Sequence, residues 1–431
     1  MSAVLDFTVK PEARPYLEAF GRTNSGEPEW LSRERQRALS RFAELGFPSR
    51  RGENWRYLDL QRLQREPLLP GKPRRDAQVP AELQMDGACA RLILIDGHCH
   101  GAVFRDLPQG VWLASMRQAI EERHDLARAA SCGEVDAEHP FDALNAAYFA
   151  DGFVLDIAPG VVLSQPLQII HFASASGAVH TRNVIRLGEG SRATILETYA
   201  GEGRYWRNDV AAVRLGARAE LTRAVLVEEA GEAVHLAELD ATLGTEARFS
   251  GFALLIGGGT VRHEASVRMT GEGAQCRLDG AFVVGDNEEA NILTNVDHQV
   301  PHGETREMIK GVAAGRAHGA FQGKIIVREH AQKVDAHQLS RNLILGPRAV
   351  IDTKPELEIY ADDVKCSHGA SVGELDETAL FYLRSRGIPD AEARHMLVEG
   401  FLREPVEEIA DPALRELLLR RLARRLERLE G

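Results

Sequence analysis

A glycine-led phrase returns along the middle of the chain at nearly constant spacing. Gly188, Gly216 and Gly244 lie 28 residues apart and each follows a leucine, and Gly273 comes 29 residues after the third. Further glycine-rich breaks lie about halfway between them, so the basic unit is one strand plus one turn of roughly 14 residues. A strand-and-turn unit with a fixed period is the signature of a solenoid.

The segments between these breaks, from about residue 150 to residue 361, are short and rich in β-branched residues. Helices long enough to connect parallel strands in β-α-β units are missing from this region. The simplest solution is a parallel β-helix, in which coils stack and bury a shared inner row of Val, Ile and Leu. An antiparallel β-sandwich is the competing interpretation of the same pattern.

One of the phrases resembles a nucleotide-binding motif. Gly188-x-Gly190-x-x-Ala193 follows a strand-like segment, as the dinucleotide fingerprint requires, but another strand follows it in place of the required helix. We therefore interpret the recurring glycines as corners of the β-helix that need unusual backbone angles. The chain also lacks a GxxxxGK[ST] motif, so we expect no ATP hydrolysis by this chain alone.

Composition excludes several functional classes. The 431 residues include 44% hydrophobic residues, enough for a large core and two or three domains, and the net charge of −12 argues against nucleic acid as a partner. The N-terminus has no apolar signal segment and no apolar run approaches about 18 residues, so we expect no secretion and no membrane insertion. The cysteines are scattered and show no CxxC spacing, which indicates free thiols in a reducing cytoplasm. They are Cys89, Cys99, Cys132, Cys276 and Cys366.

Residues 1–149 are expected to form a mixed, mainly helical region. Residues 30–45 alternate apolar and charged residues at helical spacing and end at Gly46, and residues 115–130 return to a helical pattern. Between them, residues 91–104 predict two short strands around a turn that carries His98-Cys99-His100. The two imidazoles share a face, but ordinary polar turn residues are the better interpretation, since no carboxylate-rich surroundings are evident.

After the predicted β-helix of residues 150–373, residues 374–431 return to a helical pattern. Residues 374–384 and 391–402 form amphipathic segments, and a last helix begins after Asp411-Pro412, a cap followed by a first-turn proline. Leucines form one stripe of that last helix and arginines largely occupy the other face. We expect a packed helix with a solvated basic face, with a docking helix as the alternative and membrane-surface binding as a minor one.

Cys366 and His368 place a thiol and an imidazole two residues apart. In an extended segment both side chains project to one face and Ser367 to the other. This pair is soft enough for iron, zinc or copper(I), yet a closed tetrahedral or cluster site needs four ligands, so the missing ligands must come from elsewhere. From the residues alone, a small buried cysteine and a satisfied turn histidine remain the simpler interpretation.

Two stretches resemble a known family. Residues 306–346 and 349–389, which include KVDAHQLSRNLILG and YADDVKCSHGASVGELD, are similar to the SufD branch of the SufB/SufD family of the bacterial Suf iron–sulfur cluster assembly machinery. GFPSRRGENWRYLDL near the N-terminus resembles the entry segment of that family, so the resemblance spans most of the chain. The longer SufB paralogue shares the C-terminal motif but carries more cysteines, which favours SufD.

This resemblance implies a right-handed parallel β-helix core between helical flanks and a non-catalytic scaffold role. It implies pairing with SufB and docking of the ATPase SufC through the C-terminal helices. Carried over by position, Cys366 and His368 belong to the KCSHG motif and are expected to bind iron or a transient iron–sulfur cluster shared with SufB. An isolated chain is expected either to self-associate as a homodimer or to bind metal weakly. β-Helical lyases and acyltransferases are the enzymatic alternative, but the period near 14 residues matches neither class.

Overall fold

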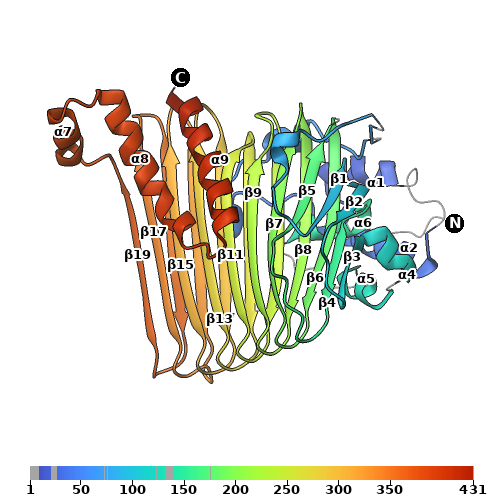
Figure 1. Ribbon diagram of the computed structural model, residues 1–431. Helices are drawn as coiled ribbons and strands as arrows, with labels where there is room; N and C mark the ends of the chain where they lie inside the picture. The colour runs from blue at the N-terminus through green and yellow to red at the C-terminus, as the bar shows by residue number, and fades with distance from the viewer. Residues whose placement is uncertain are drawn as a thin grey trace.

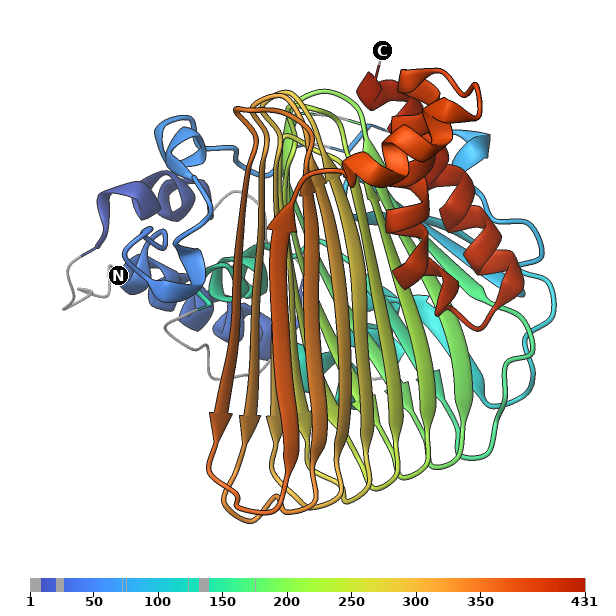
Figure 2. The same ribbon diagram turned by 90° about the vertical axis from the view of Figure 1, so that its left-hand side faces the viewer.

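A computed structural model describes residues 9–20, 27–71, 73–74, 76–122, 124–131, 139–174 and 176–430 of the chain. Two long sheets run through the molecule, and successive strands of the chain alternate between them, so that two strands and two turns make one coil (Figure 1). Helices from the two ends of the chain lie on opposite sides of this stack (Figure 2).

One sheet, which we call sheet A, contains nine strands. Its strands pair in parallel from β4 onwards, and only the β3–β4 pair is antiparallel. In spatial order the strands are β18 (Val350–Ile359), β16 (His318–Val327), β14 (Glu289–His298), β12 (Thr260–Met269), β10 (Val234–Leu243), β8 (Tyr205–Leu215), β6 (Gly177–Leu187), β4 (Phe153–Ile157) and β3 (Val111–Ser115).

The facing sheet, sheet B, contains ten strands. All its pairs are parallel except that between β1 and β2. In spatial order the strands are β19 (Lys365–Gly373), β17 (Asp335–Ile344), β15 (Glu304–Ala313), β13 (Gln275–Val284), β11 (Arg248–Gly257), β9 (Glu220–Glu228), β7 (Arg192–Gly201), β5 (Leu167–Ala173), β1 (Ala90–Ile95) and β2 (His98–Phe104).

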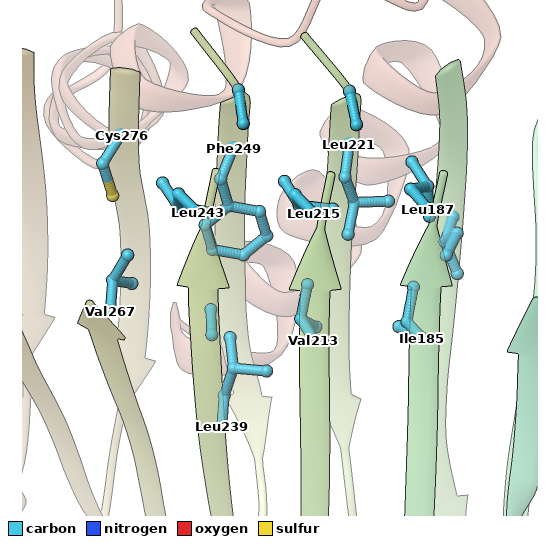
Figure 3. Packing of buried hydrophobic residues seen from close by; sticks show 14 of the residues in the cluster. Ile185, Leu187, Val213, Leu215, Leu221, Leu239, Leu243, Phe249, Val267 and Cys276 are labelled. Carbon is cyan, nitrogen blue, oxygen red and sulfur yellow. The ribbon is translucent and has the colours of Figure 1, made fainter. Parts of the chain in front are cut away.

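The prediction of a parallel β-helix is confirmed, and the antiparallel sandwich is wrong. Leu187, Leu215 and Leu243 are register partners on β6, β8 and β10, so one coil takes 28 residues at this level. Their side chains meet residues such as Leu221 and Phe249 of sheet B in one continuous inner core (Figure 3). Apolar residues at alternate positions of both sheets therefore provide the stacking that the repeat predicted.

The unusual backbone angles predicted for the recurring glycines are confirmed at Gly190 and Gly273 and are wrong for Gly188, Gly216 and Gly244. Gly188, Gly216 and Gly244 do not adopt positive φ, which occurs instead two residues later in each turn. In the next turn of the stack, Gly271 takes the place equivalent to Gly244. The N–H of Gly244 donates to Leu215 O at 2.9 Å, and the N–H of Gly271 donates in the same way to Leu243 O at 3.0 Å. The positive-φ residues are Gly190 (63°), Arg218 (54°), Glu246 (53°) and Gly273 (70°).

Close approach of stacked turns is the reason for these glycines. A Cβ atom on Gly188 would lie 2.5 Å from the backbone N of Pro159, and one on Gly271 would lie 1.9 Å from the backbone N of Thr245. Either distance is well inside van der Waals contact, so a side chain would push adjacent coils apart. Glycine therefore recurs at these positions because adjacent coils lie too close for a side chain, and not because the backbone there is left-handed.

The N-terminal helices cover the outer face of sheet A. The predicted helix of residues 30–45 is α2, which ends at Gly46 with φ 67° and packs against α6. Residues 115–130 form two helices, α4 and α5, and Arg123 between them lies outside the described residues. Apolar side chains of this region reach Trp206 and Leu236 on sheet A. The helices are α1 (Arg14–Phe20), α2 (Glu29–Leu45), α3 (Gln61–Arg65), α4 (Met116–Glu122), α5 (His124–Ser131) and α6 (Pro140–Tyr148), with single 3₁₀ turns at Pro11–Ala13, Glu53–Trp55 and Ala81–Leu83.

The C-terminal helices α8 (Asp390–Glu407) and α9 (Pro412–Glu430) cover the outer face of sheet B, and α7 (Glu377–Ser385) packs on α8. Asp411 caps α9 as predicted, because its Oδ1 accepts a hydrogen bond of 2.8 Å from the N–H of Leu414. In the part of the chain that the structure describes, no helix is both long enough and apolar enough to span a membrane. The leucine stripe of α9 packs against sheet B in one cluster with residues of β7, β9, β11 and β13, which confirms that this helix is packed. Its buried members are Leu414, Leu417, Leu418, Leu422 and Leu426. The basic face of α9 is not wholly solvated, because Arg421 is buried and pairs with Glu228 at 3.3 Å.

Candidate functional site

The stack ends in an open coil. β18 is the last strand of sheet A and β19 the last strand of sheet B, so each has a strand neighbour on one side only. β19 is largely exposed, whereas β15, two strands inward in sheet B, is mostly buried. The free edges of β18 and β19 present backbone N–H and C=O groups to whatever covers this end of the molecule.

Cys366 and His368 lie on the inner face of β19. Their register partners on β17 are Ala336 and Gln338, both buried, and Cys366 packs against the inner core. Ser367 faces the other way, where its Oγ lies 2.5 Å from Nδ1 of His337. The chain thus places the thiol and the imidazole on one face of an edge strand, at the mouth of the β-helix.

Partial burial shapes the chemistry of the Cys366 thiol. It raises the pKa of the Cys366 thiol above its ordinary value, and Asp335 adds to the effect. The thiol therefore keeps its proton in the lone chain, and a bound cation would be needed to favour the thiolate. Among the described residues, neither Cys366 nor His368 belongs to a group of three His, Cys, Asp or Glu ligand atoms within 4.8 Å.

A polar column continues inward from His368. Gln338 is its register partner on β17, and Glu307 is the partner of Gln338 on β15. The side-chain N–H of Gln338 donates to the carboxylate of Glu307, which is almost fully buried between the two sheets. Burial raises the pKa of Glu307 to about 7. The sequence analysis missed Glu307, although a charged residue at an inward-facing strand position was the available signal.

The other sequence motif with ligand-type residues has a structural explanation. The two strands lie as the pattern predicted, but the turn between them is Asp96-Gly97, so the placement of His98-Cys99-His100 in the turn was wrong and these residues open β2. The backbone N–H of Cys99 donates to Oδ2 of Asp151 at 3.1 Å, and burial lowers the pKa of His98. The hydrogen bond from Cys99 to Asp151 connects the β1–β2 hairpin to the segment before β4.

The raised pKa of Glu307 gives the free energy of unfolding a pH dependence. The folded chain keeps this proton up to about pH 7, whereas the unfolded chain loses it near the ordinary value of 4.5, so the native state loses stability as pH rises between these values. Above pH 7 the loss is complete and constant. Glu307→Gln retains the shape and removes the titration, so the stability of the variant relative to wild type should rise by about 3 kcal/mol across the window.

Urea unfolding at stepped pH measures this difference. Asp279, whose pKa burial raises to about 6, is present in both proteins, so only its electrostatic coupling to Glu307 differs between them. A stability difference that does not change between pH 4.5 and 7 would contradict the assignment of a buried, protonated Glu307.

Comparison with known proteins identifies the family to which the chain belongs. Residues 170–401 match the family model described as SUF system FeS cluster assembly, SufBD core domain. The chain is 29% identical over 423 residues to the iron-sulfur cluster assembly protein SufD of Escherichia coli K12, covering 96% of this chain and 98% of that protein. It is 26% identical over 426 residues to SufD of Bacillus subtilis 168, with 95% and 97% covered.

A SufBD family protein of Synechocystis is 28% identical over 401 residues and covers 89% of this chain and 88% of its own length. The family match covers more than half of the chain and includes both β19 and the open coil. A parallel β-helix whose last strand carries the KCSHG motif thus belongs to the SufBD family of the SUF iron–sulfur cluster assembly system.

Proposed function

We propose that the protein is a non-catalytic scaffold subunit that supports iron acquisition and cluster assembly. One observation carries the proposal: two side chains of the ligand type lie on the inner face of a strand whose outer edge is unpaired. In this role iron, or a nascent iron–sulfur cluster, is the cargo of the site, held for a time by Cys366 and His368. The four cysteines that the structure describes are all free thiols, which suits a reducing cytoplasm.

A second chain is the natural complement of the open coil. An exposed strand edge is a template for strand pairing, and a paired edge satisfies its backbone groups. A [2Fe–2S] or [4Fe–4S] cluster takes four protein ligands, and this chain offers two at the open coil. The paralogue SufB is the proposed partner, because a related β-helix stacked on β18 and β19 would add its own inner-face ligands opposite Cys366 and His368. In isolation, the same edges offer a route to a homodimer.

The C-terminal helices are the proposed docking site for the ATPase SufC. The leucine stripe of α9 is buried against sheet B and is not free for a partner. Large apolar side chains are exposed instead on α7 and α8, where Phe381 is 72% exposed, Tyr382 57% and Met396 46%. Exposed aromatic and methionine side chains of this kind are typical of protein-binding surfaces.

Substitution of the ligand pair tests the cargo site. Cys366→Ser and His368→Ala should each lower the iron and sulfide bound after anaerobic reconstitution of the complex with SufB and SufC. Complex assembly should be unchanged, because such exposed or half-buried replacements usually alter stability by less than about 0.5 kcal/mol. Ser367→Ala is the matched control, since it lies on the same strand and faces the opposite side. Full cluster loading by both variants would remove the pair from the mechanism.

Substitution on α7 tests the docking surface. The double variant Phe381→Ser, Tyr382→Ser should weaken binding of the ATPase at least tenfold, since aromatic hot spots each contribute on the order of 2 kcal/mol. Phe104→Ser is a control for the loss of an exposed ring, because Phe104 is 53% exposed on β2 at the opposite end of sheet B. Binding is measured by calorimetry or interferometry with the purified ATPase. Unchanged affinity of the double variant would place the docking surface elsewhere.

A further inference from the structure

A second group of ligand-type side chains lies far from the open coil. His139 precedes α6, Glu238 is on β10 and Glu264 is its register partner on β12, both on the outer face of sheet A. The three side chains offer one ligand atom each, and these atoms all lie within 4.8 Å of one another. Residues 99 and 26 positions apart in the sequence thus converge where the N-terminal helices meet the β-helix.

The spacing of the three side chains is compatible with a bound metal ion. Nδ1 of His139 lies 3.4 Å from Oε2 of Glu238 and 3.7 Å from Oε1 of Glu264. His139 and Glu238 thus share a long hydrogen bond in the absence of an ion. Ligand atoms about 2.1 Å from a tetrahedral ion are about 3.4 Å apart, so a small inward movement of each side chain would complete the coordination geometry.

The local charge balance favours a cation. The side chains of Glu238 and Glu264 are only 13% and 3% exposed. Arg262 pairs with Glu264 at 2.6 Å, and the nearby Asp142 is paired with Arg182 at 2.7 Å. Two largely buried carboxylates thus share this niche with His139 and one arginine, and a bound cation would lower the cost of holding both of them away from water.

Glu264 is also held in orientation by a second layer of contacts. Arg262 donates from Nη2 to Oε2 of Glu264 and from Nη1 to the backbone O of Asn54, and its guanidinium lies 4.1 Å from the ring centre of Trp55. Oε2 is thereby engaged, which leaves Oε1 as the atom that faces His139. Outer contacts that fix a carboxylate ligand in this way are a regular part of metal sites.

We propose that His139, Glu238 and Glu264 bind a divalent first-row cation such as Zn²⁺, Mn²⁺ or Fe²⁺. One imidazole and two carboxylates suit such ions, and calcium is less suited because it prefers an all-oxygen shell. A cavity of about 160 Å³, lined by His139 and Glu264 among others, gives water and the ion access to the remaining coordination positions. The ion joins α6 to β10 and β12 and so fastens the N-terminal helices to the β-helix. This inference does not depend on the proposed scaffold function.

Cobalt(II) titration of the full chain tests the site. The titration uses a Cys366→Ser, His368→Ala background, so that the open coil does not contribute ligands. The background protein should bind one Co²⁺ per chain, with visible d–d bands and no thiolate-to-cobalt band, and its unfolding temperature should rise with added Co²⁺. His139→Gln and Glu238→Gln should each abolish the bands, and Arg262→Lys should weaken binding about 10–100-fold.

A control variant and a test of folding make the Co²⁺ titration interpretable. His302→Gln is the control, because His302 and Glu272 form an exposed pair at 3.8 Å on another turn and should not affect Co²⁺ binding. Circular dichroism verifies that each variant is folded. Absence of Co²⁺ binding by the folded background protein would overturn the proposal and leave a protonated His139 in an ion-pair cluster. Unchanged binding by folded His139→Gln and Glu238→Gln would also overturn it.

Discussion

Parallel hydrogen bonding between successive coils is the constraint on which the rest of the structure depends. A strand such as β9 is satisfied only because β7 lies on one side of it and β11 on the other. Each coil therefore needs two neighbours, and the last coil has one. An unpaired terminus is a built-in consequence of a linear stack, and this chain places its ligand-type residues there.

The helices protect the sides of this stack and leave its last coil exposed. α9 covers the apolar outer face of sheet B, and the N-terminal helices cover sheet A through contacts such as those of Trp206. Inside the β-helix, the apolar core cluster continues along the stack as far as Cys366 at the open coil. Buried polar side chains occupy other inward-facing positions, both in the middle coils, at Glu197 and Arg223, and near the open coil, at Glu307 and Gln338. A bound ion or cluster at the open coil would therefore meet hydrogen-bonding groups as well as hydrocarbon.

The sequence pattern predicted those features of the fold that depend on the spacing of residues close together in the chain. The 28-residue repeat equals the number of residues in one coil. The placement of Cys366 and His368 on one face follows from the alternation of side chains along a strand. The meaning of Gly188 was misjudged because its constraint comes from Pro159 in the adjacent turn, a contact that no local propensity records. The role of each end helix was likewise decided by which sheet face it covers.

Contacts between residues far apart in the sequence could not be predicted from the sequence pattern. His139 and Glu264 lie 125 positions apart and are brought together by packing of α6 on sheet A. Glu307 is marked in the sequence only as a charged residue within a strand pattern, and its burial against Gln338 depends on which strand lies next to β15. In both cases the missing information was the register between distant segments, which the repeat alone does not specify.

Hydrogen exchange at the open coil tests the central claim most directly. Backbone amides of residues 350–359 and 365–373 are compared in the lone chain and after addition of the SufB paralogue, with β9 as the internal reference. The account predicts strong slowing of exchange in these two strands when the partner binds and no change in β9. Partner binding that protects other segments and leaves β18 and β19 exchanging at the rate of the lone chain would contradict it.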